Sequence, residues 1–163
     1  MKMEVEYVEL KSNLPFSAVI EAFENATGSV EGAGYRNAVA GARTTEEFER
    51  VIRARESTSG FMRFLTLDHG AWMNKFEGGT RQSRMYTLGN PLIARTMLRH
   101  EIAAGLNVPV RVLIFEGADG STRMAYHLPS SLMAVYRNAD VQKACEALDA
   151  KLARLAETVM GNA

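Results

Sequence analysis

The spacing of apolar side chains predicts a strand and then a helix in the first part of the chain. Residues 3–10 alternate apolar and polar side chains, which is typical of a strand with one buried face. Residues 16–23 place apolar side chains at i, i+3, i+4 and i+7, so an amphipathic helix is expected there. The segment Ser12–Pro15 provides capping side chains and a proline for its start, and Gly28 is expected to end it.

The middle of the chain alternates irregular and strongly patterned segments. Residues 29–59 are the least regular and are interpreted as an insertion carrying one short helix, with Thr44 or Thr45 as its N-cap. Residues 61–67 are almost continuously apolar, which favours a strand in the centre of a sheet. A short helix is predicted directly after it, from residue 71 to residue 76.

The second half of the chain has the clearest pattern. Strands are predicted at residues 83–88, 110–116 and 122–127, the last two joined by a hairpin turn. Asn90 and Asn138 are the expected N-caps of two helices, and the second of these helices continues to about Val159. Residues 1–163 contain no linker or repeat, so they predict a single domain. Its class is α+β, a two-layer sandwich of a largely antiparallel sheet with helices on one face.

The composition of the chain limits the kinds of molecule that it is expected to bind. Hydrophobic residues make up 47% of the 163 residues, and 19 basic side chains balance 19 acidic ones. A chain with no net charge is not expected to be a general nucleic-acid binder. No apolar run approaches the length that a membrane span needs, so no membrane partner and a cytoplasmic location are expected. The single cysteine, Cys145, falls on an apolar helix face and is expected to be buried.

Five motifs occur in an order that resembles the domain-of-unknown-function family numbered three hundred and two. They are Asp68–Ala71 (DHGA), Tyr86–Ala94 (YTLGNPLIA), Pro109–Val112 (PVRV), Tyr126 with Pro129–Ser131, and Leu148–Leu152 (LDAKL). The resemblance implies a fold like the TATA-binding-protein half-domain and association as a homodimer. It implies no activity, and a fold alone does not make the chain a DNA binder.

Asp68 and His69 stand where the predicted central strand meets a helix. His69 is the first candidate for catalysis, as a general base that Asp68 could orient. The alternative is structural, with Asp68 capping the helix and His69 in its first turn.

Gly89 and Asn90 open a helix directly after a strand. The free N–H groups of a helix N-terminus can hold an anion, and a glycine allows close approach. Structural capping is the alternative, because no phosphate-binding fingerprint surrounds the pair.

Three further residues complete the candidate ligand site. Arg111 lies among apolar neighbours on a strand, either on the solvated face or in a cleft together with Tyr126, where it could bind a carboxylate or phosphate. Trp72 belongs to an apolar group with Met73 and Phe76. We expect this group in the core, with the wall of a ligand pocket or a dimer contact as alternatives.

These residues favour a small-ligand-binding domain whose ligand and cofactor the sequence does not identify. Asp68, His69, Trp72, Gly89, Asn90, Arg111 and Tyr126 are the expected site. One alternative is an enzyme with His69 as general base and an anionic substrate at the Gly89–Asn90 turn. A weaker alternative is a haem or metal protein that uses one of its histidines.

Overall fold

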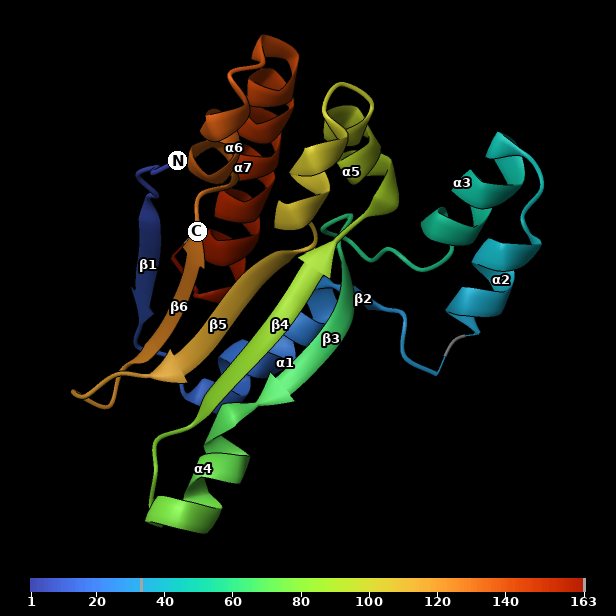
Figure 1. The fold of residues 1–163 in the computed structure, drawn as a ribbon. Coiled ribbons are helices and arrows are strands. Elements are labelled where there is room, and N and C mark those ends of the chain that lie inside the picture. Colours follow the sequence, from blue (N-terminus) through green and yellow to red (C-terminus); the bar gives the residue numbers. More distant parts are fainter. Residues whose placement is uncertain (33, 163) are drawn as a thin grey trace.

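Six strands form one sheet within residues 1–32 and 34–162, which the computed structural model describes (Figure 1). They are β1 (Tyr7–Ser12), β2 (Gly28–Ser29), β3 (Met62–Asp68), β4 (Ser83–Gly89), β5 (Val110–Glu116) and β6 (Thr122–His127). Their order across the sheet is β1-β6-β5-β4-β3-β2. The β2–β3 pair is parallel and the other pairs are antiparallel, which confirms the predicted, largely antiparallel sheet.

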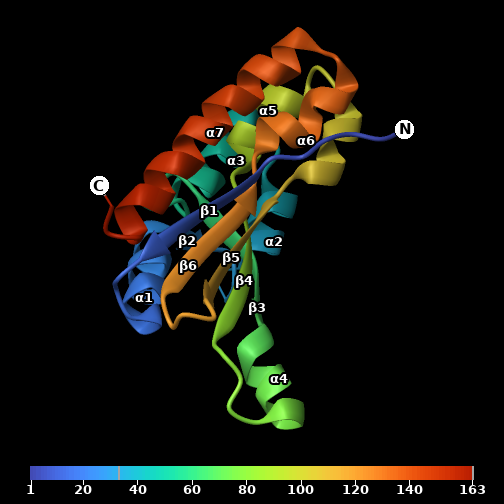
Figure 2. The ribbon, with the colours of Figure 1, turned by 90° about the vertical axis from the view of Figure 1, so that its left-hand side faces the viewer.

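The helices differ in how closely they pack on the sheet. They are α1 (Phe16–Ala26), α2 (Tyr35–Gly41), α3 (Thr45–Arg53), α4 (His69–Glu77), α5 (Pro91–Leu98), α6 (Pro129–Met133) and α7 (Ala139–Val159), with 3₁₀ segments η1 (Ile102–Asn107) and η2 (Ala134–Tyr136). In Figures 1 and 2, α4 extends beyond one end of the sheet. Figure 1 shows α2 and α3 beside the β3 edge. The segment 29–59 thus contains two helices where one was predicted, and its status as an insertion stays a prediction.

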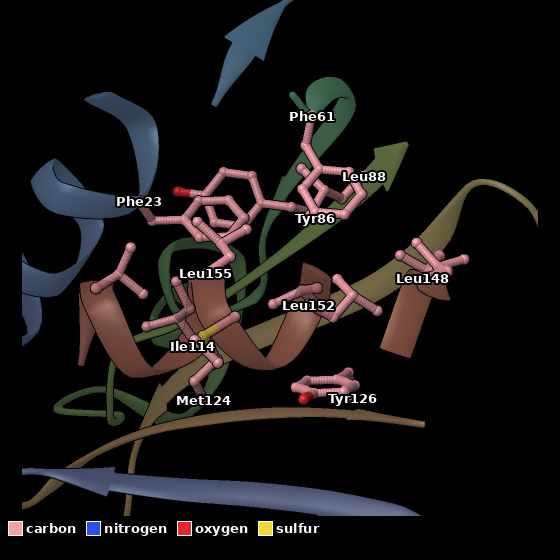
Figure 3. Close-up of a cluster of buried hydrophobic side chains, with 14 of the residues drawn as sticks. Phe23, Phe61, Tyr86, Leu88, Ile114, Met124, Tyr126, Leu148, Leu152 and Leu155 are labelled. Carbon is pink, nitrogen blue, oxygen red and sulfur yellow. The ribbon is translucent and has the colours of Figure 1, made fainter. Parts of the chain in front are cut away.

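The two faces of the sheet differ in burial. On β5, Val112 is buried and Arg111 is exposed. Val112 pairs with Tyr86 on β4 and with Tyr126 on β6, so both tyrosines point into the same core. Figure 3 shows these rings among side chains from α1 and α7. One face is therefore covered by helices, as the predicted α+β class requires.

Local capping follows the sequence at three helices. The Thr44 side chain accepts a hydrogen bond from Glu47 N (3.1 Å), and Asn138 caps α7 through Asp140 N and Val141 N. Asn90 caps α5 through Leu92 N at 2.8 Å, with Pro91 at the first helical position. All three caps confirm the predictions.

The first strand and helix depart from their predicted bounds. Strand β1 spans Tyr7–Ser12 instead of residues 3–10, because its ladder follows the partner strand β6. The start of α1 has no side-chain cap, since the Ser12 hydroxyl donates to Met160 O (2.6 Å) and accepts from Leu14 N (3.1 Å). Gly28 lies in β2 and pairs with β3, so it does not end the helix.

The only thiol lies in the core. Cys145 is fully buried between the sulfur atoms of Met97 and Met133, as predicted. Burial, reinforced by the charges of Asp149 and Glu146, raises the pKa of the thiol to about 11. Cys145 therefore stays protonated at neutral pH and packs as an apolar side chain.

Among the described residues, no helix is long and apolar enough to cross a membrane.

Candidate functional site

A pocket of about 800 Å³ lies between α3, α5 and the adjoining ends of β3, β4 and β5. Its base consists of core side chains that are almost inaccessible from outside, namely Phe61, Leu88, Met97, Val110 and Leu148. Its walls are partly buried and also apolar, formed by Phe48, Phe64, Ile93, Leu98 and Val108. The pocket thus leads from solvent to the centre of the hydrophobic core.

Asn90 holds one wall of the pocket in place. Its Nδ2 donates to Glu56 Oε2 (2.7 Å) and to Gly60 O (2.8 Å), while its Oδ1 accepts from Leu92 N. Both amide protons are used, so the side chain joins α5 to the segment that enters β3. Asn90 therefore shapes the wall, and its amide donors are not available to a ligand.

Gly89 is required by close packing at the same wall. A Cβ at this position would lie 3.3 Å from Pro109 Cβ and 3.6 Å from Phe64 Cε2. The glycine thus allows the end of β4 to approach two other lining residues. Gly89 and Asn90 are the two predicted site residues that line this pocket.

Asp68 and His69 lie at the opposite end of β3. Asp68 Oδ1 accepts from Ala71 N (2.8 Å) and caps α4, while its Oδ2 pairs with Arg84 Nη2 at 3.2 Å. His69 Nδ1 accepts from Trp72 Nε1 at 3.0 Å. The structural alternative for Asp68 is therefore observed, and Asp68 does not bond to the imidazole in the contacts of the described chain.

The aromatic group on α4 is not part of the core. Trp72 is 49% exposed and Phe76 is 79% exposed, so the expected core packing is wrong. The rings follow one another along the helix, with centroids of His69 and Trp72 6.0 Å apart and those of Trp72 and Phe76 6.4 Å apart. The reason is that α4 extends past the end of the sheet, away from the other helices and strands of the described chain (Figures 1 and 2).

Arg111 and Tyr126 do not meet. Arg111 is exposed on the uncovered face of β5, whereas Tyr126 is buried on the helix-covered side of β6. Burial is the main cause that raises the pKa of the Tyr126 hydroxyl. The structure thus distributes the predicted site over the pocket, the α4 end, the open face and the core, and does not gather it in one place.

A polar network joins α1 to the centre of the sheet. Tyr86 donates from its hydroxyl to Glu24 Oε1 (2.8 Å), and the guanidinium groups of Arg63 and Arg84 each lie 3.6 Å from the same carboxylate. Burial and the nearby carboxylate of Glu24 raise the pKa of Tyr86, so its hydroxyl remains a donor. These contacts hold α1 against β3 and β4, and the residues that form them do not line the pocket.

The charged side chains that line the pocket were not predicted from the sequence. Arg43, Arg95 and Arg99 are exposed lining residues, accompanied by Glu49. A signal was present for two of them, because Arg95 and Arg99 are four residues apart in the helix predicted after Asn90 and therefore lie on the same side of it. In the described chain, no three histidine, cysteine or carboxylate side chains are grouped so that they could hold a metal ion.

Comparisons with known proteins identify a family and a fold. The family model described as "Domain of unknown function DUF302" matches residues 38–159. The crystal structure of an uncharacterized conserved DUF302 protein from Bacillus stearothermophilus is similar, with a TM-score of 0.67 at 11% sequence identity. The likeness covers 94% of this chain and 97% of that one, and at this identity it shows the fold alone. No curated protein matched the chain.

Proposed function

Because the chain belongs to the DUF302 family, whose description assigns no activity, we propose a function from the pocket itself. The chain is a small-ligand-binding domain, and the apolar body of its ligand occupies the space between α3 and α5. Gly89 and Asn90 form part of the wall of this pocket. A cytoplasmic location stays a prediction.

The observation that carries this proposal is an open pocket that reaches the core. Ligand sites are typically concave, about 300–1,000 Å³ in volume and mostly apolar, with a few polar groups that fix orientation. The pocket here has about 800 Å³ and a base of core side chains such as Phe61 and Leu88. No comparable observation favours catalysis by His69, which does not line the pocket.

Filling the pocket is expected to abolish binding of an apolar probe. Ala94 lines the pocket on α5, so Ala94→Trp places an indole in the space where the ligand body would lie. We expect the wild-type chain to enhance Nile red fluorescence and the variant to bind the dye at least about tenfold more weakly, which matches the loss of roughly one buried aromatic contact. Fluorescence titration measures both dissociation constants.

Thr96→Trp is the matched control, since Thr96 is exposed on the same helix and does not line the pocket. It should bind Nile red as the wild type does. Thermal unfolding must show that both variants are folded. Equal dye affinity in a folded Ala94→Trp variant, or no enhancement by the wild type, would show that the pocket does not accept an apolar ligand.

We further propose that the homodimer implied by the family resemblance forms along β3 and α4. Four large apolar side chains of β3 and α4 are exposed, namely Leu65 (44%), Leu67 (39%), Trp72 (49%) and Phe76 (79%). Exposed apolar side chains that gather on neighbouring elements often mark a protein–protein contact.

Charges on α4 suit a second copy of the chain. A two-fold interface must be self-complementary, because the same patch is used on both sides. Lys75 and Glu77 lie on the same exposed helix, and neither forms an ion pair in the part of the chain described here. The two charges are two positions apart and lie on different sides of α4, so both can stay at the solvent-exposed edge of such an interface.

Charged substitutions of the exposed apolar side chains on β3 and α4 are expected to produce a monomer. Leu67→Lys and Phe76→Lys should each weaken dimerisation about tenfold or more, since burying a lysine in an apolar contact is costly. Light scattering coupled to size exclusion measures the change over a range of concentrations. Leu106→Lys is the control, because Leu106 is 87% exposed on η1. A wild-type chain that is monomeric at high concentration would rule out the dimer.

A further inference from the structure

Positive side chains gather at the mouth of the pocket. Arg43 precedes α3, while Arg95 and Arg99 lie one turn apart at the end of α5. All three are exposed and line the pocket, and the one acidic lining residue is Glu49. The chain as a whole has no net charge, with 19 basic and 19 acidic side chains. The excess of positive charge is therefore local to this mouth.

Among the described residues, Arg43, Arg95 and Arg99 form no ion pair. The ion pairs found among the described residues involve other cations, and neither Arg95 nor Arg99 donates a side-chain hydrogen bond there. Arg63, Arg84 and Arg123, in contrast, all pair with carboxylates. Arg95 and Arg99 lie near the C-terminus of α5, where the helix dipole stabilises a positive charge. The dipole does not explain why both side chains line a pocket.

The amino-terminal end of α3 provides two hydroxyl groups at the opening, while Glu46 and Glu47 in its first turn offset the positive end of the helix. Thr44 and Thr45 open this helix and also line the pocket. The Thr44 oxygen accepts from Glu47 N, which leaves its hydroxyl proton free to be donated. The guanidinium groups on α5 and the threonine hydroxyls of α3 thus line the same opening, and the base of the pocket beneath them is apolar.

We infer that the ligand is an amphipathic anion, with an apolar chain or ring system in the pocket and a carboxylate or phosphate at the mouth. This inference rests on the proposed function and specifies its ligand class. Arg95 and Arg99 hold the oxyanion, because a guanidinium matches the geometry of carboxylate and phosphate oxygens. Arg43 approaches from the α3 side. The head group stays near solvent, so its charge is not fully desolvated.

The inference predicts a preference among ligands that share one apolar chain. Dodecanoate, dodecyl phosphate, dodecanol and dodecylammonium are each used to displace Nile red from the full chain. The three ions are used below their critical micelle concentrations and dodecanol below its solubility limit. We expect the two anions to bind about tenfold or more tightly than the alcohol, since hydrogen bonds to charged groups contribute more than neutral ones. The ammonium ion should bind most weakly. Comparison of the two anions shows whether the mouth prefers carboxylate or phosphate.

The double variant Arg95→Gln/Arg99→Gln tests which residues produce this preference. Its affinity for both anions should fall to the level of dodecanol, while its affinity for dodecanol should be unchanged. Arg50→Gln is the matched control, because Arg50 is exposed on α3 and does not line the pocket. A variant in which Nile red and dodecanol bind normally is folded at the site, so a loss of anion binding is not a folding defect.

The outcomes separate this inference from the proposed function. Equal binding of dodecanol and dodecanoate, or tighter binding of dodecylammonium, overturns the anionic ligand and leaves an apolar ligand site in place. An anion preference that persists in the double variant overturns the role of Arg95 and Arg99. If none of the four compounds displaces Nile red and the dye does not bind, both the inference and the proposed function fail.

Discussion

Replacing Asn90 by aspartate is expected to lower the free energy of unfolding by about 3 kcal/mol, because two buried donors become acceptors. Asn90 is 5% exposed, and its Nδ2 donates to Glu56 Oε2 and Gly60 O. Aspartate would keep the cap on Leu92 N, since aspartate is as good an N-cap as asparagine. It would also place a carboxylate against the carboxylate of Glu56 and the carbonyl of Gly60.

The pH dependence of Asn90→Asp has a definite sign. Two facing carboxylates raise the pKa of the pair in the folded state, so the folded variant binds more protons than the unfolded chain. Relative to the wild type, the variant should therefore regain stability as the pH falls from neutral towards the ordinary range of these carboxyl groups, about 4. Urea unfolding of both proteins at several pH values measures this difference.

Two further substitutions separate the functions of the Asn90 side chain. Asn90→Ser keeps a capping oxygen without adding a charge, so its cost should be smaller, about 1–2 kcal/mol. Asn90→Ala removes the cap as well and should cost more than the serine. If Asn90→Asp were as stable as the wild type at neutral pH, the contacts of Nδ2 with Glu56 and Gly60 would not contribute to stability.

Replacing Gly28 by alanine is expected to destabilise the protein by about 3 kcal/mol or more, at the upper end of overpacking in a folded protein. A Cβ at Gly28 would overlap with the carbonyl oxygen of Arg55, and backbone atoms cannot move away as a flexible side chain can. Gly28 N also donates to Phe61 O at 2.8 Å, and the residue pairs with Met62 in the parallel ladder. Relief of the clash would disrupt both contacts.

Gly41→Ala is the matched control for this substitution. Gly41 ends α2, and nothing lies within 4 Å of a Cβ built there. Alanine is favoured over glycine in a helix, so this variant should be neutral or slightly more stable. Chemical denaturation of the two variants measures the difference. Equal stability of Gly28→Ala and Gly41→Ala would contradict the close packing of β2 against Arg55.

Gly28→Ala should also reduce binding in the pocket. The chain leaves β2 after Ser29 and returns at β3, and α3 of the intervening segment provides Phe48 to the pocket wall. Disruption of the β2–β3 pair releases one end of this segment. Nile red affinity of the folded fraction is therefore expected to fall, while Gly41→Ala should bind normally.

Strong local patterns gave correct elements. The Asn138 cap and the long apolar repeat that follows it predicted α7, and the turn between β5 and β6 was visible in Ala118–Gly120. These features depend on residues a few positions apart, so the sequence contains all the information they need. Bounds that depend on a distant partner were wrong, as at β1, whose ladder is set by β6.

The candidate site was predicted only in part, for a similar reason. Gly89 and Asn90 were found because a strand end, a cap and a proline are adjacent in sequence. Asn90 proved to join Glu56 and Gly60, two contacts that no local pattern can reveal. Trp72 was expected in the core from its helical spacing, but spacing cannot show that α4 extends beyond the sheet.

The sequence by itself determined the class of fold, the family resemblance, three helix caps and the burial of Cys145. Each follows from short-range hydrogen bonding or from the cost of leaving apolar surface in water. The tertiary structure alone decided that Arg111 and Tyr126 lie on opposite sides of the sheet. It also decided that Arg43, Arg95 and Arg99 line the same pocket. Those arrangements depend on strand register and on how α3 packs beside α5, which bring together residues far apart in the chain.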